Sequence, residues 1–164
     1  MFFDTDCSEP SKSDVKFGLC DPDGEAKAYS DTENPDDWIA TVENPDGKNV
    51  QFTAIDNCVP LFKGDTKKEE SSCDGMLTAG NRLFLVELKA RGSGDWRATG
   101  MKQLVNTIRL LKEHDRDKLA EYTIKRAYVC NKLKPRFTYI VNELNRTFLS
   151  EHGFRLDIHA TVTI

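Results

Sequence analysis

Residues 74–89, DGMLTAGNRLFLVELK, carry the strongest structural signal in the sequence. The Gly-Asn dipeptide at positions 80–81 suits a two-residue hairpin loop of type II′, with strands on either side. In that register the numbers of facing residues sum to 161, so Asp74 faces Glu87. Residues 83–86 are apolar on both faces, which is typical of a central strand. The sequence therefore predicts a central hairpin with acidic residues at its open end.

Charged side chains are expected to converge at this open end. Counted outward from the loop, Asp74 and Glu87 form a non-hydrogen-bonded pair, in which side chains lie closest. Lys89 projects from the same face as Glu87, because strand side chains alternate. Two facing carboxylates repel one another unless a hard cation such as Mg²⁺ or Mn²⁺ lies between them. We expect Asp74, Glu87 and the backbone carbonyl of Leu88 to bind this ion.

Lys89 would then act on the metal-bound water or on the charge of a phosphate in the transition state. The alternative is that Glu87 and Lys89 form the solvent-exposed face of an edge strand and that Asp74 is a turn residue. The apolar run before Glu87 favours the central strand and hence the site.

The rest of residues 63–164 alternates between helical and strand patterns, which predicts a mixed α/β core. A proline near the start of the second helix and a glycine after its end fit the usual helix signals. The expected elements after the hairpin are a helix over 95–113, a strand over 124–130, a helix over 135–152 and a strand over 154–164. The apolar stripes of the helices are Met101, Leu104, Val105, Ile108 and Leu111, and Phe137, Ile140, Val141, Leu144 and Phe148.

Upstream of the core the sequence predicts a polar, flexible N-terminus over residues 1–14 and an acidic antiparallel β meander over residues 15–62. Two Pro-Asp-Gly turns divide the meander. Its strands are expected at 15–20, 26–29, 38–42 and 50–55. Residues 63–73 are charged and small, which indicates a mobile connection.

The composition fits one globular domain packed from both parts, since 164 residues can bury a sizeable core. The net charge of −4 divides unevenly: residues 1–74 sum to −11 and residues 75–164 to +7. Such an asymmetry suggests two electrostatic roles. The longest apolar run has four residues, against about 20 for a bilayer span, so no membrane contact is expected.

The cysteines and the N-terminal residues bear on the cellular compartment. The five cysteines are odd in number, widely spaced and without a C-x-x-C pair, which argues against a disulfide framework or a zinc site. Residues 1–6 lack the pattern of a secretory signal. We therefore expect a reducing, cytoplasmic environment.

The hairpin resembles the PD-(D/E)XK phosphodiesterase superfamily, the restriction-endonuclease-like nucleases. Asp74 and then Glu87-Leu88-Lys89, after 12 intervening residues, match its D…(D/E)-x-K pattern, and the following helix and strand match its β-β-α-β order. The resemblance covers about residues 50–131. It implies a restriction-endonuclease-like mixed central sheet flanked by helices, metal-binding carboxylates at Asp74 and Glu87, a catalytic Lys89 and a supporting Gln103.

The resemblance also implies an activity, namely metal-dependent hydrolysis of DNA phosphodiester bonds in defence against foreign DNA or in repair. Two departures from the family pattern stand out. Cys73 replaces the nominal proline, and the family's first helix, which often contributes a glutamate, is not obvious upstream. The candidates for a fourth acidic residue are Asp56, Glu69 and Glu70.

Basic residues of the second half could form a phosphate-binding face; a run of charges is usually a solvated surface, but the net charge of +7 over residues 75–164 favours nucleic acid. The candidates for nucleic-acid contact are Arg91, Arg97, Lys102, Lys132, Lys134 and Arg136. A different class of function is a non-catalytic inhibitor, immunity or regulatory subunit on the same fold, whose acidic half binds a protein partner. A third hypothesis is that the acidic half covers the basic half. A homodimer is compatible with the sequence.

Overall fold

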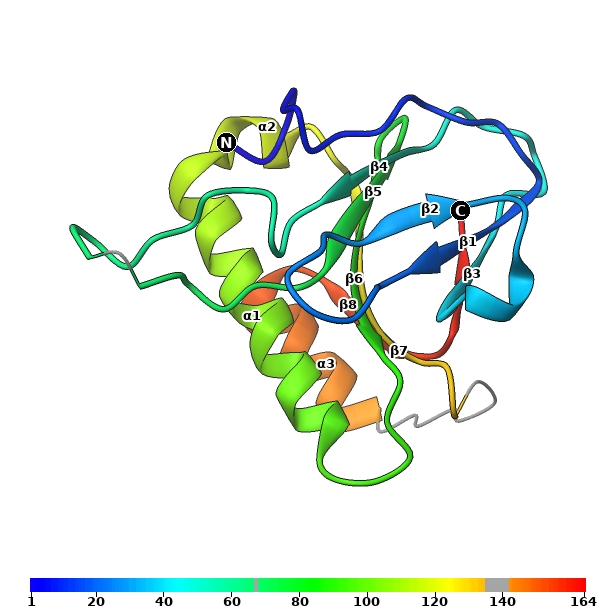
Figure 1. The fold of residues 1–164 in the computed structure, drawn as a ribbon. Coiled ribbons are helices and arrows are strands. Elements are labelled where there is room, and N and C mark those ends of the chain that lie inside the picture. The colour runs from blue at the N-terminus through cyan, green and yellow to red at the C-terminus, as the bar shows by residue number, and fades with distance from the viewer. Residues whose placement is uncertain (67, 135–141) are drawn as a thin grey trace.

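A computed structural model describes residues 1–66, 68–134 and 142–164 of the chain (Figure 1). In this part of the chain the fold is mixed α+β, with two mixed sheets and three α-helices. The helices are α1 (Trp96–His114), α2 (Arg116–Ala120) and α3 (Asn142–His152), and a short 3₁₀ helix, η1, spans Pro35–Asp37.

A five-stranded sheet forms the centre of the molecule. Its spatial order is β4 (Gln51–Ala54), β5 (Gly75–Ala79), β6 (Arg82–Lys89), β7 (Ile124–Asn131) and β8 (Arg155–Ile158). The first three strands are antiparallel to one another, and β7 and β8 run parallel to β6. Strand β6 is therefore central, as the sequence predicts.

The predicted hairpin register is confirmed. Ala79 pairs with Arg82, and the ladder continues outward to Gly75 and Val86. Gly80 has a φ of 57°, and Asn81 is not among the residues with positive φ, which fits the type II′ loop.

A four-stranded sheet packs against one face of the central sheet. It contains β2 (Tyr29–Asp31), β1 (Lys16–Cys20), β3 (Ala40–Glu43) and β9 (Thr161–Thr163), in that order. Strand β1 pairs antiparallel with both neighbours, and β3 pairs parallel with β9. The predicted meander is therefore interrupted, since β4 leaves it to pair with β5.

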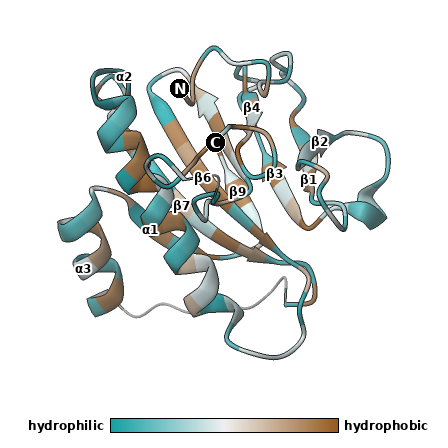
Figure 2. Cartoon of the chain, turned by 60° about the vertical axis from the view of Figure 1, so that its left-hand side comes forward, coloured by the Kyte–Doolittle hydropathy of each residue, from teal (hydrophilic) through white to brown (hydrophobic). Residues whose placement is uncertain are grey.

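The central sheet separates two hydrophobic clusters, so the molecule has three layers (Figures 1 and 2). On β6, Leu83 and Leu85 face the helices, whereas Phe84, Val86 and Leu88 face the four-stranded sheet. This alternation puts the odd-numbered residues of β6, Glu87 and Lys89 among them, on the face that α1 covers.

Helix α1 begins where the sequence predicts. Asp95 is its N-cap, and the Asp95 carboxylate accepts a hydrogen bond from the Ala98 N–H at 3.4 Å. The prediction for the second helix is tested only in part: α3 is described from Asn142, and Phe137, Ile140 and Val141 lie outside the described residues.

The prediction of one strand over 154–164 is wrong. The segment forms β8 in the central sheet and β9 in the other sheet, with His159 and Ala160 between them. Leu156 and Ile158 join the cluster under the helices, and Val162 joins the cluster between the sheets. Crossing from one sheet to the other buries apolar residues in both clusters.

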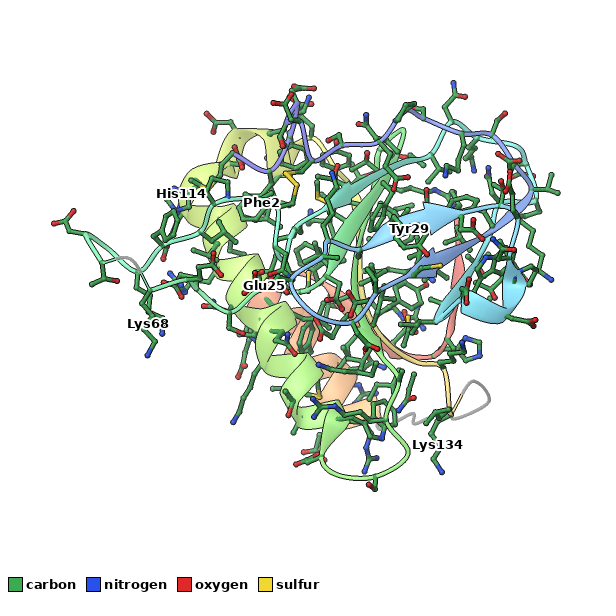
Figure 3. The ribbon with its side chains drawn as sticks, in the orientation of Figure 1. Phe2, Glu25, Tyr29, Lys68, His114 and Lys134 are labelled. Carbon is green, nitrogen blue, oxygen red and sulfur yellow. A yellow bond between two sulfur atoms is a disulfide. The ribbon has the colours of Figure 1, made fainter. Side chains whose placement is uncertain are left out.

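The expectation of a flexible N-terminus is also wrong, because residues 1–12 are packed (Figure 3). Phe2 is fully buried, and its N–H and the Met1 ammonium both donate to the Asp115 carboxylate at 2.8 Å. Further on, backbone hydrogen bonds tie residues 7–12 to β4. The segment thereby covers an edge of the central sheet.

A disulfide joins Cys7 to Cys58, with Cα atoms 5.8 Å apart, which corrects the expectation drawn from the cysteine pattern. Spacing along the chain could not reveal it, because the two residues are 51 positions apart and meet only through the fold. The cysteines therefore no longer argue for a reducing compartment. The other three, Cys20, Cys73 and Cys130, are buried and free. Within the described ranges, every helix is too short or too polar to cross a membrane.

Candidate active site

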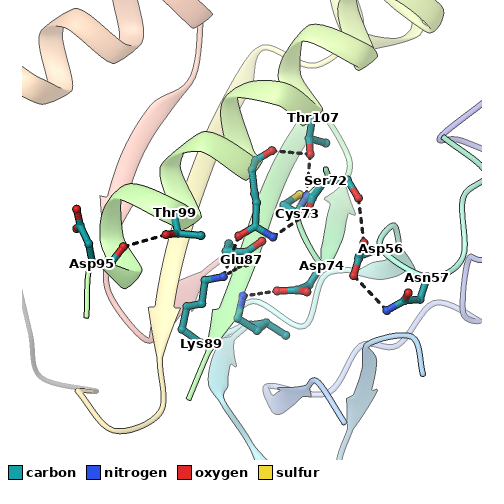
Figure 4. A network of polar contacts seen from close by, with 12 residues as sticks. Asp56, Asn57, Ser72, Cys73, Asp74, Glu87, Lys89, Asp95, Thr99 and Thr107 are labelled. Atoms are coloured by element: carbon teal, nitrogen blue, oxygen red, sulfur yellow. Dashed lines mark hydrogen bonds and ion pairs between the residues drawn. The ribbon is translucent and has the colours of Figure 1, made fainter. Parts of the chain in front are cut away.

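The candidate site lies at the carboxyl end of β6, next to the start of β5 and packed against α1 (Figure 4). Extending the observed register by one step from Gly75 and Val86 places Asp74 beside Glu87. The Asp74 carboxylate accepts a hydrogen bond from the Leu88 N–H at 2.5 Å. Leu88 thus contributes its N–H to the site, and its carbonyl as a metal ligand stays a prediction.

Lys89 is held by two partners. Its ammonium lies 2.6 Å from Glu87 Oε1 and donates to Gln103 Oε1 at 2.8 Å. Gln103 in turn donates from Nε2 to the Ser72 carbonyl at 3.2 Å. Ser72 precedes Asp74 by two residues. Gln103 was expected at the site only from the family resemblance, and the structure brings it to the lysine.

Helix α1 can lie this close to the carboxylates because residue 100 is glycine. A Cβ atom at Gly100 would lie 3.2 Å from Glu87 Cγ and 2.9 Å from a Val129 methyl group. The absence of that atom lets the Gln103 side chain reach Lys89.

Both carboxyl groups are buried, with exposed fractions of 6% for Asp74 and 1% for Glu87. Burial raises the pKa of Asp74 to about 7, against the opposing effects of the Leu88 N–H and Lys89. Burial, and secondly Asp74, raise the pKa of Glu87 well above its ordinary value. Glu87 Oε2 has no hydrogen-bond partner among the described residues. The single ammonium of Lys89 therefore does not offset the burial of both carboxyl groups.

These groups line a cavity of about 330 Å³ together with acidic residues from elsewhere in the chain. Asp56, in the turn after β4, is one of them, and its carboxylate accepts from Ser72 Oγ at 3.4 Å. Of the three candidates for a fourth acidic residue, Asp56 alone lines the cavity. Glu69 pairs with Phe62 in an isolated β-bridge, and Glu70 forms an ion pair with Arg109 at 3.2 Å.

Two further acidic residues, Asp21 and Asp23, line the same cavity, and sequence reasoning missed them. They follow β1 of the four-stranded sheet, in a stretch that the sequence identified only as a turn. Burial and the neighbouring Asp56 raise the pKa of Asp21, and Lys89 opposes them. No local sequence signal could have found this contact, because it depends on how the two sheets pack.

The predicted basic residues are dispersed. Arg91 lines the cavity, and Lys132 lines an adjacent hollow, where its ammonium donates to the Asp36 carbonyl. By contrast, Arg97 and Lys102 line a groove beside Leu144 of α3. Lys134 is exposed, and Arg136 lies outside the described residues. The structure therefore brings only Arg91 of this set to the site.

The oxygen donors fit a hard divalent cation, since the two carboxyl groups are buried and adjacent and Glu87 Oε2 has no partner within residues 1–66, 68–134 and 142–164. No group of three or more His, Cys, Asp or Glu side chains in the described part of the chain is arranged to hold a metal ion. The predicted ligand set contains only two such side chains, Asp74 and Glu87, together with a backbone carbonyl, so it is smaller than any group of three.

Comparison with known proteins does not extend the resemblance. No protein-family model, curated protein or solved structure matches the chain. The resemblance to the PD-(D/E)XK nucleases therefore rests on the pattern of Asp74, Glu87 and Lys89 and on the order of the elements around them.

Proposed function

We propose that the protein is a metal-dependent nuclease that hydrolyses DNA phosphodiester bonds, on a restriction-endonuclease-like core of the PD-(D/E)XK type. The observation that carries the proposal is the open end of the hairpin. There Asp74 and Glu87 are buried side by side, and Lys89 lies 2.6 Å from Glu87 in the same cavity. Structural ion pairs do not usually leave a buried carboxylate oxygen unpaired, and Glu87 Oε2 has no hydrogen-bond partner in the part of the chain that the structure describes.

In this proposal Asp74 and Glu87, with the Leu88 carbonyl, hold Mg²⁺ or Mn²⁺. The bound ion would supply a water of lowered pKa and positive charge for the phosphate oxygens. The two carboxylates are already buried and adjacent, so they need little rearrangement to accept it.

Lys89 would orient the attacking water or stabilise the charge that develops on the phosphate. An ammonium group has three N–H donors. Glu87 and Gln103 engage two of them, which leaves the third for a water or phosphate oxygen in the cavity. Because the side chain is largely buried, such a hydrogen bond would be stronger than one in water.

The first test is calorimetric titration with Mn²⁺. The wild-type protein should bind the ion, and Asp74→Asn and Glu87→Gln should each weaken binding by at least about tenfold, because each removes one anionic ligand. Asp46→Asn is a matched control, since Asp46 is exposed and pairs only with Lys48 at 3.4 Å in the described structure.

Mn²⁺ binding that is absent, or that is equal in all four proteins, would contradict the proposal. That result would favour the second class of function, a non-catalytic protein whose acidic half binds a basic partner.

A further inference from the structure

The loops of the acidic sheet meet the candidate site directly. The turn after β1 contributes Asp21 and Asp23 to the cavity that contains Lys89 and Arg91. In Figure 1 the chain between β1 and β2 crosses in front of the central sheet near the end of β6. The two parts of opposite charge therefore share one cavity.

A second contact extends this junction. The lining of an adjacent hollow includes Asp21, Asp23, Asp37 and Lys132. The Lys132 ammonium donates to the backbone carbonyl of Asp36, in η1. Thus Arg91 and Lys132, which could contact a DNA backbone, line hollows that also contain acidic residues of the loops.

We infer that Asp21 and Asp23, called here the acidic collar, exclude DNA from the site until a divalent cation is bound. The inference rests on the proposed function, since it concerns how that site admits its substrate. It assigns a role to residues outside the hairpin motif. The collar acts by charge, and it requires no movement of the loop.

The charges around the cavity support this order of binding. The cavity lining in the described chain contains five carboxyl groups and two cationic groups. The carboxyl groups belong to Asp21, Asp23, Asp56, Asp74 and Glu87, and the cationic groups to Lys89 and Arg91. Even if the two buried carboxyl groups are protonated, the formal charge of the lining is negative. A phosphodiester anion is therefore repelled, and a divalent cation that binds when all five carboxyl groups are ionised reduces that repulsion without reversing it.

The strand that leads into the collar is tightly packed. It follows Cys20 at the end of β1, where Phe17 and Leu19 are fully buried. The Trp38 ring lies against Gly18, since a Cβ atom there would be 1.9 Å from the ring, and Trp38 Nε1 donates to Asp31 at 2.8 Å. These contacts anchor β1, the strand from which the collar extends toward the cavity.

The test compares DNA binding by the wild type and by the double variant Asp21→Asn/Asp23→Asn. A fluorescently labelled oligonucleotide, single-stranded and as a duplex, is titrated in EDTA, where metal-dependent cleavage cannot occur. The variant should bind about tenfold more tightly than the wild type, equivalent to about 1.4 kcal/mol. The difference should shrink with Mn²⁺ and at high salt, because both screen the collar.

The matched control is Asp14→Asn/Asp46→Asn, which removes two exposed charges of the same acidic half outside both hollows. If the collar variant binds within twofold of this control in EDTA, the collar is refuted and the nuclease proposal stands on its own test. If no protein binds DNA with or without Mn²⁺, the proposed function fails and the collar fails with it. Thermal melting of each variant confirms that the compared proteins are folded.

Discussion

Two clusters of acidic and basic side chains include or contact residues of α1, and the pKa values of Glu70 in one and Glu87 in the other shift in opposite directions. In one, Glu70 pairs with Arg109, which also pairs with Glu113 at 2.7 Å. In the other, Glu87 pairs with Lys89, which Gln103 supports. We call these the surface cluster and the site cluster. Their residue types are nearly the same, so composition does not distinguish them.

Burial separates the two clusters. The Asn106 amide, and then Arg109, lower the pKa of Glu70, whose partners are largely exposed. The pKa of Glu87 is raised, because desolvation outweighs the attraction of Lys89. A protein that needed only stability would gain little from a buried, incompletely paired carboxylate. The site cluster is therefore the one that we associate with function.

The largest expected difference comes from replacing the cationic residue of each cluster with alanine. Lys89→Ala should reduce DNA cleavage by about 10³-fold, because it removes the donor that the proposed mechanism uses for the attacking water or the phosphate. Arg109→Ala should leave cleavage within twofold, since its partners lie outside the cavity. A plasmid cleavage assay with Mg²⁺ measures both. Equal activity of Lys89→Ala and wild type would remove the lysine from the mechanism.

The second prediction concerns the disulfide next to the turn that contains Asp56. The Cys7–Cys58 disulfide closes the turn that carries Asp56 and spans 51 positions, so Cys7→Ser/Cys58→Ser should lower the free energy of unfolding by roughly 4 kcal/mol. Urea unfolding measures this loss. Hydrogen exchange should rise at residues 55–58 and stay unchanged around Glu70. Unchanged unfolding in the double variant would show that the disulfide adds no stability.

The smallest effect is the pH dependence of stability without metal. Asp74 titrates near pH 7 in the folded protein and near 3.8 when unfolded, so the unfolded state ionises first. Its contribution is fully present below about pH 4 and is lost as the pH rises through 7. The loss is at most about 4 kcal/mol.

Asp74→Asn removes this titration, so the variant should lose less stability than the wild type between pH 4 and pH 8. Glu70→Gln should do the opposite, because the lowered pKa of Glu70 makes its contribution disappear as the pH falls. Thermal melting across this pH range, without divalent cations, compares the three proteins. Parallel curves for Asp74→Asn and wild type would show that folding does not raise the pKa of Asp74.

The sequence was informative wherever the determining interaction was local. A Gly-Asn dipeptide specified the hairpin loop, and the loop fixed the register that aligns Asp74 with Glu87. Alternation along β6 then placed Lys89 on the same face, whereas Gln103 was named only through the family resemblance. Each step involves neighbouring strands or a single element, where backbone geometry leaves few alternatives.

The sequence failed wherever distant segments had to meet. The disulfide, the packed N-terminus, the transfer of residues 161–163 to the second sheet and the approach of Asp21 to Lys89 all depend on how separate elements pack. Packing is set by the burial of many apolar side chains together, and no single motif encodes it. The sequence alone therefore determined the hairpin and its charged end. Only the tertiary structure decided which other carboxylates surround that end.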